Sequence, residues 1–415
     1  MSEQEILVEK HIFRKGHPQY AEMDRITFLS KNLYNSTLYA IRQNYFSNGV
    51  WLNYNVVNAD FTHSRNPDYT ALPTKVSKHT QMLVCQAITS YLGLLKKYKT
   101  GELKNKPHLP RYLDSKEGRQ VTHYEKGTIS RKELKNGIVK LSGTNIRIRT
   151  KIPAEQVQFA RIVPCSGYIT VEIGYKRELC KMKEPKGRYA SIDLGIDNLA
   201  VVSSNVMDPY IIDGKKLKHI NNRYNRELAK RKSQLAYIND RKTSHRIRNT
   251  TLKRSNRITD YMHKASAMLV NQLDSSGIDT LVIGYTKGWK QDTDMGKVNN
   301  QKFVNIPFNR FISDLEYKCR QKGIRVILHE ESYTSKCSFF DDEEITKHET
   351  YCRKRVARGL FKTKEDKLIN ADLNGSLNIM KKALSSVDKW NPELWKQCVM
   401  QNLNSAVERR KVILS

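Results

Sequence analysis

Two segments far apart in the chain hold the residues best suited to metal chemistry. Residues 370–379 read NADLNGSLNI and place one carboxylate, Asp372, among small and amide side chains at the start of an expected helix. Residues 191–197 read SIDLGID and place another carboxylate, Asp193, within an apolar strand. A buried strand rarely tolerates an unpaired charge, so the pair favours a metal site. Taken singly, Asp193 also fits a strand-end turn, and Asp372 fits a helix N-cap.

The chain is strongly basic, which favours a polyanionic partner. Its 415 residues include 73 Lys and Arg against 42 Asp and Glu, a formal net charge of +31. An excess that large is typical of proteins that bind nucleic acid. Its apolar runs are short and its first residues are polar, so we expect no membrane partner and no secretory signal. The seven scattered cysteines are expected to be reduced, in a cytoplasmic, nucleoid-associated prokaryotic protein.

The first part of the chain is expected to hold a helical and a β module. A strand within residues 1–14 precedes helical apolar spacing over residues 15–110. Over residues 111–186 the period changes to two, which predicts a small antiparallel sheet or barrel. The pair at 136–137, Asn-Gly, predicts a hairpin turn within it.

The second part alternates strands and helices, which predicts an α/β sheet over residues 187–336 and 369–384. A long, basic helical insertion is expected over residues 215–265. Residues 337–368 show little periodicity and predict an inserted loop module, and residues 385–415 form a weakly specified tail. The α/β domain would therefore position both acids.

Phosphodiester hydrolysis explains why such acids would be brought together. Two Mg²⁺ ions, roughly 3.5–4 Å apart, can activate water and stabilise the charge on the attacking and leaving oxygens. Mg²⁺ prefers oxygen ligands, so at least three acids from distant segments are needed. Glu330 and Glu331 close an expected strand over residues 324–328 and are further candidates, although a solvated strand end is the simpler interpretation.

Four motifs in a fixed order give the chain a family resemblance. They are SIDLGI at 191–196, YTKGWKQ at 285–291, EESYTSK at 330–336 and NADLN at 370–374. The series resembles TnpB (OrfB), a family of transposon-encoded RNA-guided nucleases related to type V CRISPR effectors. The likeness covers nearly the whole chain and is far more specific than any single motif.

The resemblance implies a RuvC/RNase H-like nuclease domain with a helical recognition module and a β-barrel wedge module. It implies an RNA-guided DNA endonuclease that binds a guide RNA, recognises a short motif beside its target, and cuts both strands with Mg²⁺. The implied partners are the guide RNA and a double-stranded and single-stranded DNA target. Asp193 and Asp372 match the first and third acids of the family. Many relatives carry the second acid where this chain has Gly284; a subgroup has it on the next strand, here Glu330 or Glu331.

The family's zinc ribbon departs from its usual pattern here. Many relatives carry two Cys-x-x-Cys pairs before the last acid, whereas this interval holds Cys337, His348 and Cys352. Structural zinc normally takes four closed ligands, so we expect no zinc. Local packing of aromatic and aliphatic side chains would hold the module instead, for instance Phe339, Phe340, Leu360 and Phe361.

Basic side chains are the candidates for contacts to the phosphates of nucleic acid. Those in the insertion are Arg223, Arg226, Lys230, Arg231, Arg246, Arg248, Lys253, Arg254 and Arg257, with Asn222 and Tyr224 beside them. Those elsewhere are Arg147, Arg149, Lys287 and Lys290, with Trp289. Aromatic residues of the helical module could stack on bases, although core packing is the simpler interpretation: Tyr34, Tyr39, Tyr45, Trp51 and Tyr54.

Three alternatives to an RNA-guided endonuclease stay open. A nuclease-inactive RNA-guided DNA-binding repressor is favoured by Gly284 and disfavoured by Asp193 and Asp372. A strand-transfer transposase could use the same metal chemistry without a guide. A miniature type V CRISPR effector would differ mainly in the source of its guide.

Overall fold

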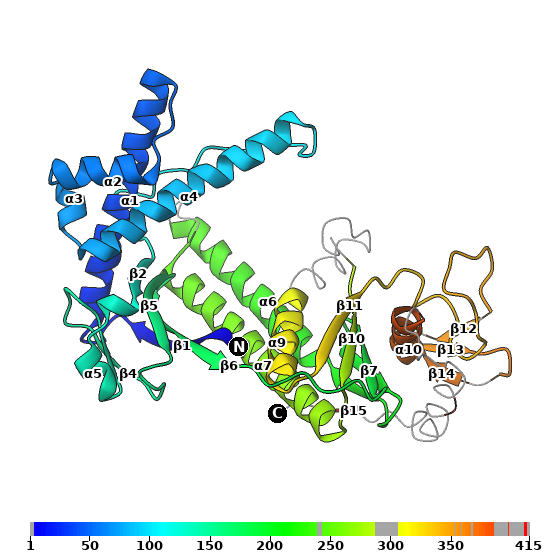
Figure 1. Ribbon diagram of the computed structural model, residues 1–415. Helices are drawn as coiled ribbons and strands as arrows, with labels where there is room; N and C mark the ends of the chain where they lie inside the picture. Colours follow the sequence, from blue (N-terminus) through cyan, green and yellow to red (C-terminus); the bar gives the residue numbers. More distant parts are fainter. Residues whose placement is uncertain are drawn as a thin grey trace. The chain divides into compact units, whose positions relative to one another are not determined.

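A computed structural model gives the structure of the protein. It describes residues 4–238, 243–286, 306–352, 354–357, 359–366, 368–385, 397 and 411–412. The chain divides into two compact units, residues 1–178 and 179–415, and each is described by itself (Figure 1). Among the described residues, no helix has both the length and the apolar character that crossing a membrane requires.

The first unit contains a group of helices built on two long amphipathic segments. These are α1 (Tyr20–Asn48), α2 (Tyr54–His63), α3 (Pro67–Thr70) and α4 (Thr74–Lys99). Leu33 and Ile41 of α1 and Val84 of α4 are fully buried, as the helical apolar spacing predicts. The predicted helical character of this region is thus confirmed.

An antiparallel sheet of four strands completes the first unit. Its order is β1 (Gln4–Arg14), β6 (Tyr168–Glu178), β5 (Val157–Cys165) and β2 (Thr122–Glu125). Among the described residues its outer strands β1 and β2 pair with no further strand, so this is an open sheet, and the expected barrel is not confirmed.

The predicted hairpin turn at Asn136-Gly137 is wrong. These residues end the short helix α5 (Arg131–Lys135), where the amide of Gly137 bonds to the carbonyl of Leu134 and its φ is +72°. An Asn-Gly pair serves a helix end as well as a hairpin because both need a left-handed residue. The hairpin lies just beyond, where β3 (Ile138–Lys140) pairs with β4 (Arg147–Arg149).

A six-stranded sheet forms the centre of the second unit, as the alternation of strands and helices predicts. The order is β11 (Arg325–His329), β10 (Thr280–Gly284), β7 (Tyr189–Leu194), β8 (Asn198–Ser204), β9 (Tyr210–Asp213) and β15 (Lys411–Val412). The strands β7, β10 and β11 run parallel, and β8 is antiparallel to β7. The carboxyl ends of the three parallel strands therefore meet at one edge.

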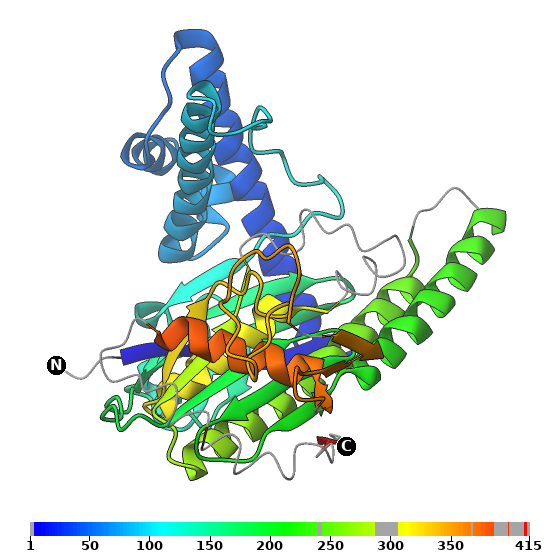
Figure 2. The same ribbon diagram turned by 90° about the vertical axis from the view of Figure 1, so that its right-hand side faces the viewer.

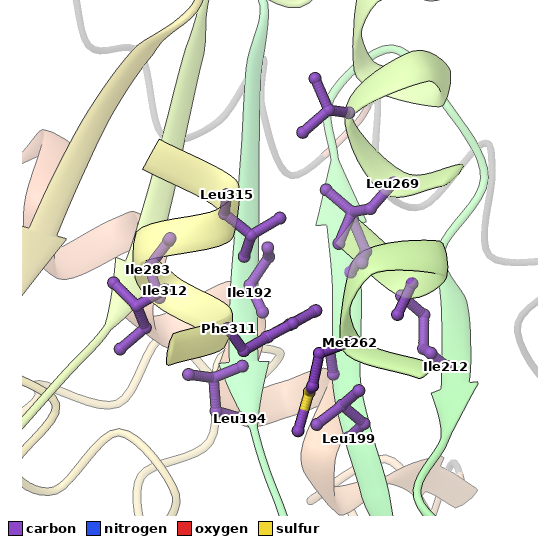
Figure 3. Close-up of a cluster of buried hydrophobic side chains, with 14 of the residues drawn as sticks. Ile192, Leu194, Leu199, Ile212, Met262, Leu269, Ile283, Phe311, Ile312 and Leu315 are labelled. Atoms are coloured by element: carbon purple, nitrogen blue, oxygen red, sulfur yellow. The ribbon is translucent and has the colours of Figure 1, made fainter. Parts of the chain in front are cut away.

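Helices cover both faces of this sheet. The helices α7 (His245–Ser275) and α9 (Phe308–Gln321) pack on one face, and α10 (Ala371–Leu384) lies on the other. Ile192 and Ile283 point into the larger core beneath α7 and α9, together with Phe311 (Figure 3). Val282 instead packs against Ile379 of α10. Alternate residues of each strand thus face opposite layers.

Two further parts of this unit differ in detail from the sequence expectation. The basic insertion is two helices lying side by side, α6 (Lys215–Ile238) and α7 (Figure 2). The module expected as loop contains a three-stranded antiparallel sheet, with β12 (Lys354–Ala357), β13 (Leu360–Lys362) and β14 (Leu368–Asn370). Strands of three or four residues are too short to show a period in the sequence.

Candidate metal centre and nucleic-acid interface

Asp193 lies on the face of the sheet that α10 covers. Its neighbours Ile192 and Leu194 point into the core on the opposite face, whereas Ser191 donates a hydrogen bond of 2.7 Å to the carbonyl of Ser376 in α10. Because side chains alternate along a strand, Asp193 shares the face of Ser191. The apolar strand thus presents one carboxylate to the α10 layer.

Gly284 is the residue beside Asp193 on the neighbouring strand. The parallel register pairs Ile283 with Ile192, so the next position of each strand is Gly284 and Asp193. A β-carbon on Gly284 would lie 2.6 Å from Oε2 of Glu331 and 2.5 Å from Cδ1 of Ile379. The carboxylate of Glu331 therefore occupies the space that a side chain at position 284 would fill.

Gly375 brings α10 close to the same carboxylate. A β-carbon at this position would lie 2.6 Å from Oδ2 of Asp193. The one-atom side chain of glycine is what permits this close approach. The sequence analysis identified the acids and not Gly375, although this glycine lies only three residues after Asp372.

Asp372 enters from the first turn of α10. The side chain of Asn370 caps this helix by accepting hydrogen bonds from the amides of Asp372 and Leu373, so Asn370, and not Asp372, is the N-cap. The carboxylate of Asp372 accepts a hydrogen bond of 2.7 Å from Nδ2 of Asn198, at the start of β8. Asn198 was missed because nothing local in the sequence connects it with a residue 174 positions away.

The other two acids act electrostatically on Asp193. The pKa of Asp193 is raised well above its ordinary value, first by burial and then by the negative charges of Glu331 and Asp372. Burial and like charges both disfavour the ionised form. A cation among these groups would reverse that penalty, which is the behaviour expected of a metal site.

Glu330 is directed elsewhere. It is exposed, and its carboxylate pairs with Nζ of Lys382 at 2.7 Å and accepts a hydrogen bond of 2.8 Å from the amide of Ser332. Slight burial raises the pKa of Glu330, but these partners outweigh it and lower the pKa overall. Of the two adjacent glutamates, Glu331 is therefore the one turned toward Asp193.

The donor set suits Mg²⁺, although the side chains are not gathered into a closed site. Asp193, Glu331 and Asp372 offer only carboxylate oxygens, which hard cations prefer. Within the described residues, no three acidic, histidine or cysteine side chains converge tightly enough to hold an ion as they stand. The residues fit the ion by chemistry and position, and binding requires side-chain adjustment.

In the part of the small module that the structure describes, the cysteines do not make such a group either. Cys337 is buried, and its thiol bonds to the carbonyl of Thr346. The carboxylate of Glu343 accepts hydrogen bonds from the amides of Ser338 and Cys352. Phe339 joins a buried cluster with α10 residues, and Phe340 packs edge-on against it. The absence of zinc stays an expectation.

A basic crevice lies between α6 and α7. Its volume is about 230 Å³. Its lining includes five cationic side chains: Arg223, Arg231, Lys253, Arg254 and Arg257. Arg254 donates a hydrogen bond to Asn221 and lies 5.1 Å from the ring centroid of Tyr224, and burial lowers its pKa. A crevice with several cations is a ready site for a phosphate.

The other predicted nucleic-acid contacts are dispersed. Arg226, Lys230, Arg246 and Arg248 are exposed outside the crevice lining. Arg147 and Arg149 are exposed on β4, and Arg147 pairs with Glu133. Lys287, Trp289 and Lys290 lie outside the described residues. Tyr45 and Trp51 stack on each other at 3.9 Å within the first unit.

Two family profiles match the chain. Residues 168–290 match OrfB_IS605, described as a probable transposase. Residues 308–379 match the TNB domain of the Cas12f1-like family. The second match covers the module after β11 and the start of α10, so both segments that carry acids fall within a profile.

Known proteins with similar sequence or structure were found as well. TnpB-like protein ORF457 of Acidianus two-tailed virus is 25% identical over 228 residues, which is 51% of this chain and 46% of that relative. The match thus spans about half of the relative's length. Among solved structures, the Cas12f1–sgRNA–target DNA complex aligns with 15% identity over 90% of this chain and 98% of that chain, with a TM-score of 0.37. The mini-RNA-guided endonuclease CRISPR-Cas_phi3 aligns with 11% identity over 92% of each chain, with a TM-score of 0.46.

TM-scores this low carry no argument by themselves. The ordered motifs, the two sequence profiles and the viral relative all point to one family. The chain is similar to proteins of the TnpB (OrfB) family.

Proposed function

We propose that this protein is an RNA-guided DNA endonuclease of the RuvC type that uses Mg²⁺. The observation that carries the proposal is the position of the three acids at one edge of the sheet. Asp193 and Glu331 reach the carboxyl ends of β7 and β10, and Asp372 enters from α10. Ligands of open α/β sheets bind at this edge.

In the proposed site, the three acids would bind the metal ions and the neighbouring residues would position the acids. Asp193, Glu331 and Asp372 would hold two Mg²⁺ ions, which when bound supply a nucleophilic water and charge stabilisation for phosphodiester hydrolysis. Asp193 would be the central ligand, because Gly284 leaves room for Glu331 beside it and Gly375 lets α10 approach it closely. Asn198 orients the carboxylate of Asp372 by donating a hydrogen bond to Oδ2. Glycines 284 and 375 leave the room that these carboxylates occupy.

The basic crevice between α6 and α7 would hold the nucleic-acid backbone. The partners we propose are a guide RNA and a double- and single-stranded DNA target. Arginine suits this role because its planar guanidinium binds phosphate oxygens in pairs. Such contacts depend on the shape of a duplex and not on its sequence. The first unit would supply the helical recognition and wedge modules.

A nuclease-inactive, RNA-guided repressor is the second candidate. It is favoured by the glycine at position 284, which places no acid beside Asp193 on β10. Both candidates predict guide RNA binding, so cutting is what separates them.

The test has two parts. First, RNA that copurifies with the protein is sequenced, which identifies the guide. Second, the complex is incubated with a matching target plasmid and Mg²⁺, alongside the Asp193→Ala and Asp372→Ala variants. We expect the parent to cut and both variants to bind the target without cutting. Tight guided binding without cutting by the parent would support the repressor instead.

A further inference from the structure

Two amide side chains of α10 hold the loop that follows Glu331. Asn374 and Asn378 are fully buried and lie one helical turn apart. Residues four apart share a helix face, so both amides meet the same neighbouring segment. We call the two together the amide clamp.

The amide clamp makes four hydrogen bonds to backbone groups of residues 334–339. Asn374 accepts from the amide of Phe339 at 2.8 Å and donates to the carbonyl of Cys337 at 2.8 Å. Asn378 donates to the same carbonyl at 2.7 Å and to the carbonyl of Thr334 at 2.9 Å. Buried backbone groups in an irregular loop must find partners, and these amides supply them.

The clamped loop begins directly at Glu331. The amide and hydroxyl of Thr334 both bond to the carbonyl of Glu331, at 3.2 and 2.7 Å. This tight turn includes Tyr333 with φ of +66°, a left-handed conformation that is unfavourable for a bulky residue. A strained turn persists only where its surroundings hold it in place. Asn378 does so through the carbonyl of Thr334.

Glu331 needs this support because it lies beyond the regular strand. The strand β11 ends at His329, two residues before Glu331. The helix that carries the amide clamp also carries Asp372 and approaches Asp193 at Gly375. The helix α10 therefore contacts the segments that carry all three acids, and the position of Glu331 relative to Asp193 and Asp372 depends on it.

We infer that Asn374 and Asn378 are positioning residues, which hold Glu331 in place for metal binding by fastening the 331–339 turn to α10. This inference rests on the proposed function. Groups that orient metal ligands typically affect metal affinity by roughly 10–100-fold. The amide clamp would act on metal binding mainly through the position of Glu331.

The test measures Mn²⁺ binding to the full-length, RNA-free chain by calorimetry, for the parent, Asn374→Ala, Glu331→Gln and the double variant. When Glu331 is intact, we expect Asn374→Ala to weaken Mn²⁺ binding about tenfold relative to the parent chain. In the Glu331→Gln background it should have little further effect. An equal loss in both backgrounds would overturn the inference, because the effect would then not pass through Glu331.

Asn205→Ala is the matched control. Asn205 also joins two backbone groups, accepting from the amide of Tyr189 and donating to the carbonyl of Gly187, at the opposite end of β7. It should leave Mn²⁺ binding unchanged while losing a similar amount of thermal stability. A similar loss of Mn²⁺ binding in this control would reduce the role of Asn374 to general stability and refute the inference.

A milder variant covers the case in which Asn374→Ala does not fold. Asn378→Ser keeps a hydrogen-bond donor on α10, and it should weaken Mn²⁺ binding by a smaller factor, again only when Glu331 is present. Unchanged binding in that variant contradicts the inference. If Glu331→Gln itself binds Mn²⁺ like the parent, the proposed ligand is wrong, which is a different failure from that of the clamp.

Discussion

Replacing Gly284 with alanine tests the fit between this glycine and Glu331. The new β-carbon would lie 2.5 Å from Cδ1 of Ile379 and 2.6 Å from Oε2 of Glu331. Favourable contacts between such atoms are about 3.5–4.0 Å, so each neighbour must move by about 1 Å. Overpacking of this kind costs about 1–3 kcal/mol of stability. A 1 Å misplacement in an active site can cost about 10²-fold in rate.

We therefore expect Gly284→Ala to cut target DNA about 10²-fold more slowly while its guided DNA binding stays near the parent level. The assay is plasmid cleavage under single-turnover conditions, with binding measured separately by gel shift. Gly93→Ala is the matched control, because nothing lies within 4 Å of the added β-carbon in α4.

A second change separates the two contacts. Ile379→Val removes Cδ1 and leaves Cγ1 at 3.2 Å from the position of the new β-carbon. Combined with Gly284→Ala, it should recover much of the lost stability without restoring cutting, because Glu331 is still displaced. Cleavage at the parent rate by Gly284→Ala alone would refute the reasoning.

Three further predictions concern the surroundings of the site. Asn198→Ala removes the donor to Asp372 and should slow cutting roughly tenfold or more at unchanged guided binding; parent-like cutting in a cleavage assay would contradict this. Arg257→Ala removes one cation of the α6–α7 crevice and should weaken nucleic-acid binding similarly for all sequences, with a salt dependence shallower by about one unit in binding titrations. His123 stacks on His79 and Phe159, and its pKa is lowered to about 4 from 6.5 by burial, by His79 and by Arg161. Below pH 6.5 the His123 side chain takes up a proton in the unfolded chain, whereas in the folded chain it does so only near pH 4. Protein stability therefore falls as the pH falls from 6.5 to about 4. In His123→Phe, the melting temperature should depend less on pH over this range.

The sequence predicted those features that have local signatures. The apolar residues around Asp193 predicted the strand that carries this carboxylate. The helical spacing of Leu33, Leu38 and Ile41 predicted α1 equally well. Where a local signature serves two structures, as Asn136-Gly137 does, the choice was wrong.

The parts that could not be predicted depend on contacts across the chain. Adjacent residues of an extended segment face opposite ways, so one of Glu330 and Glu331 had to point away from the site. Lys382, 52 residues later, pairs with Glu330, and no pattern around either glutamate indicates it. The role of Asn198 likewise depends on a partner in α10.

The comparison of Glu330→Gln with Glu331→Gln tests the central claim most directly. Each variant, bound to its guide RNA, is given a matching target plasmid and Mg²⁺, and cutting and guided binding are measured together. The account predicts that Glu331→Gln binds the target and does not cut it, whereas Glu330→Gln loses only an exposed ion pair with Lys382 and cuts near the parent rate. Cutting by Glu331→Gln at the parent rate would contradict the account.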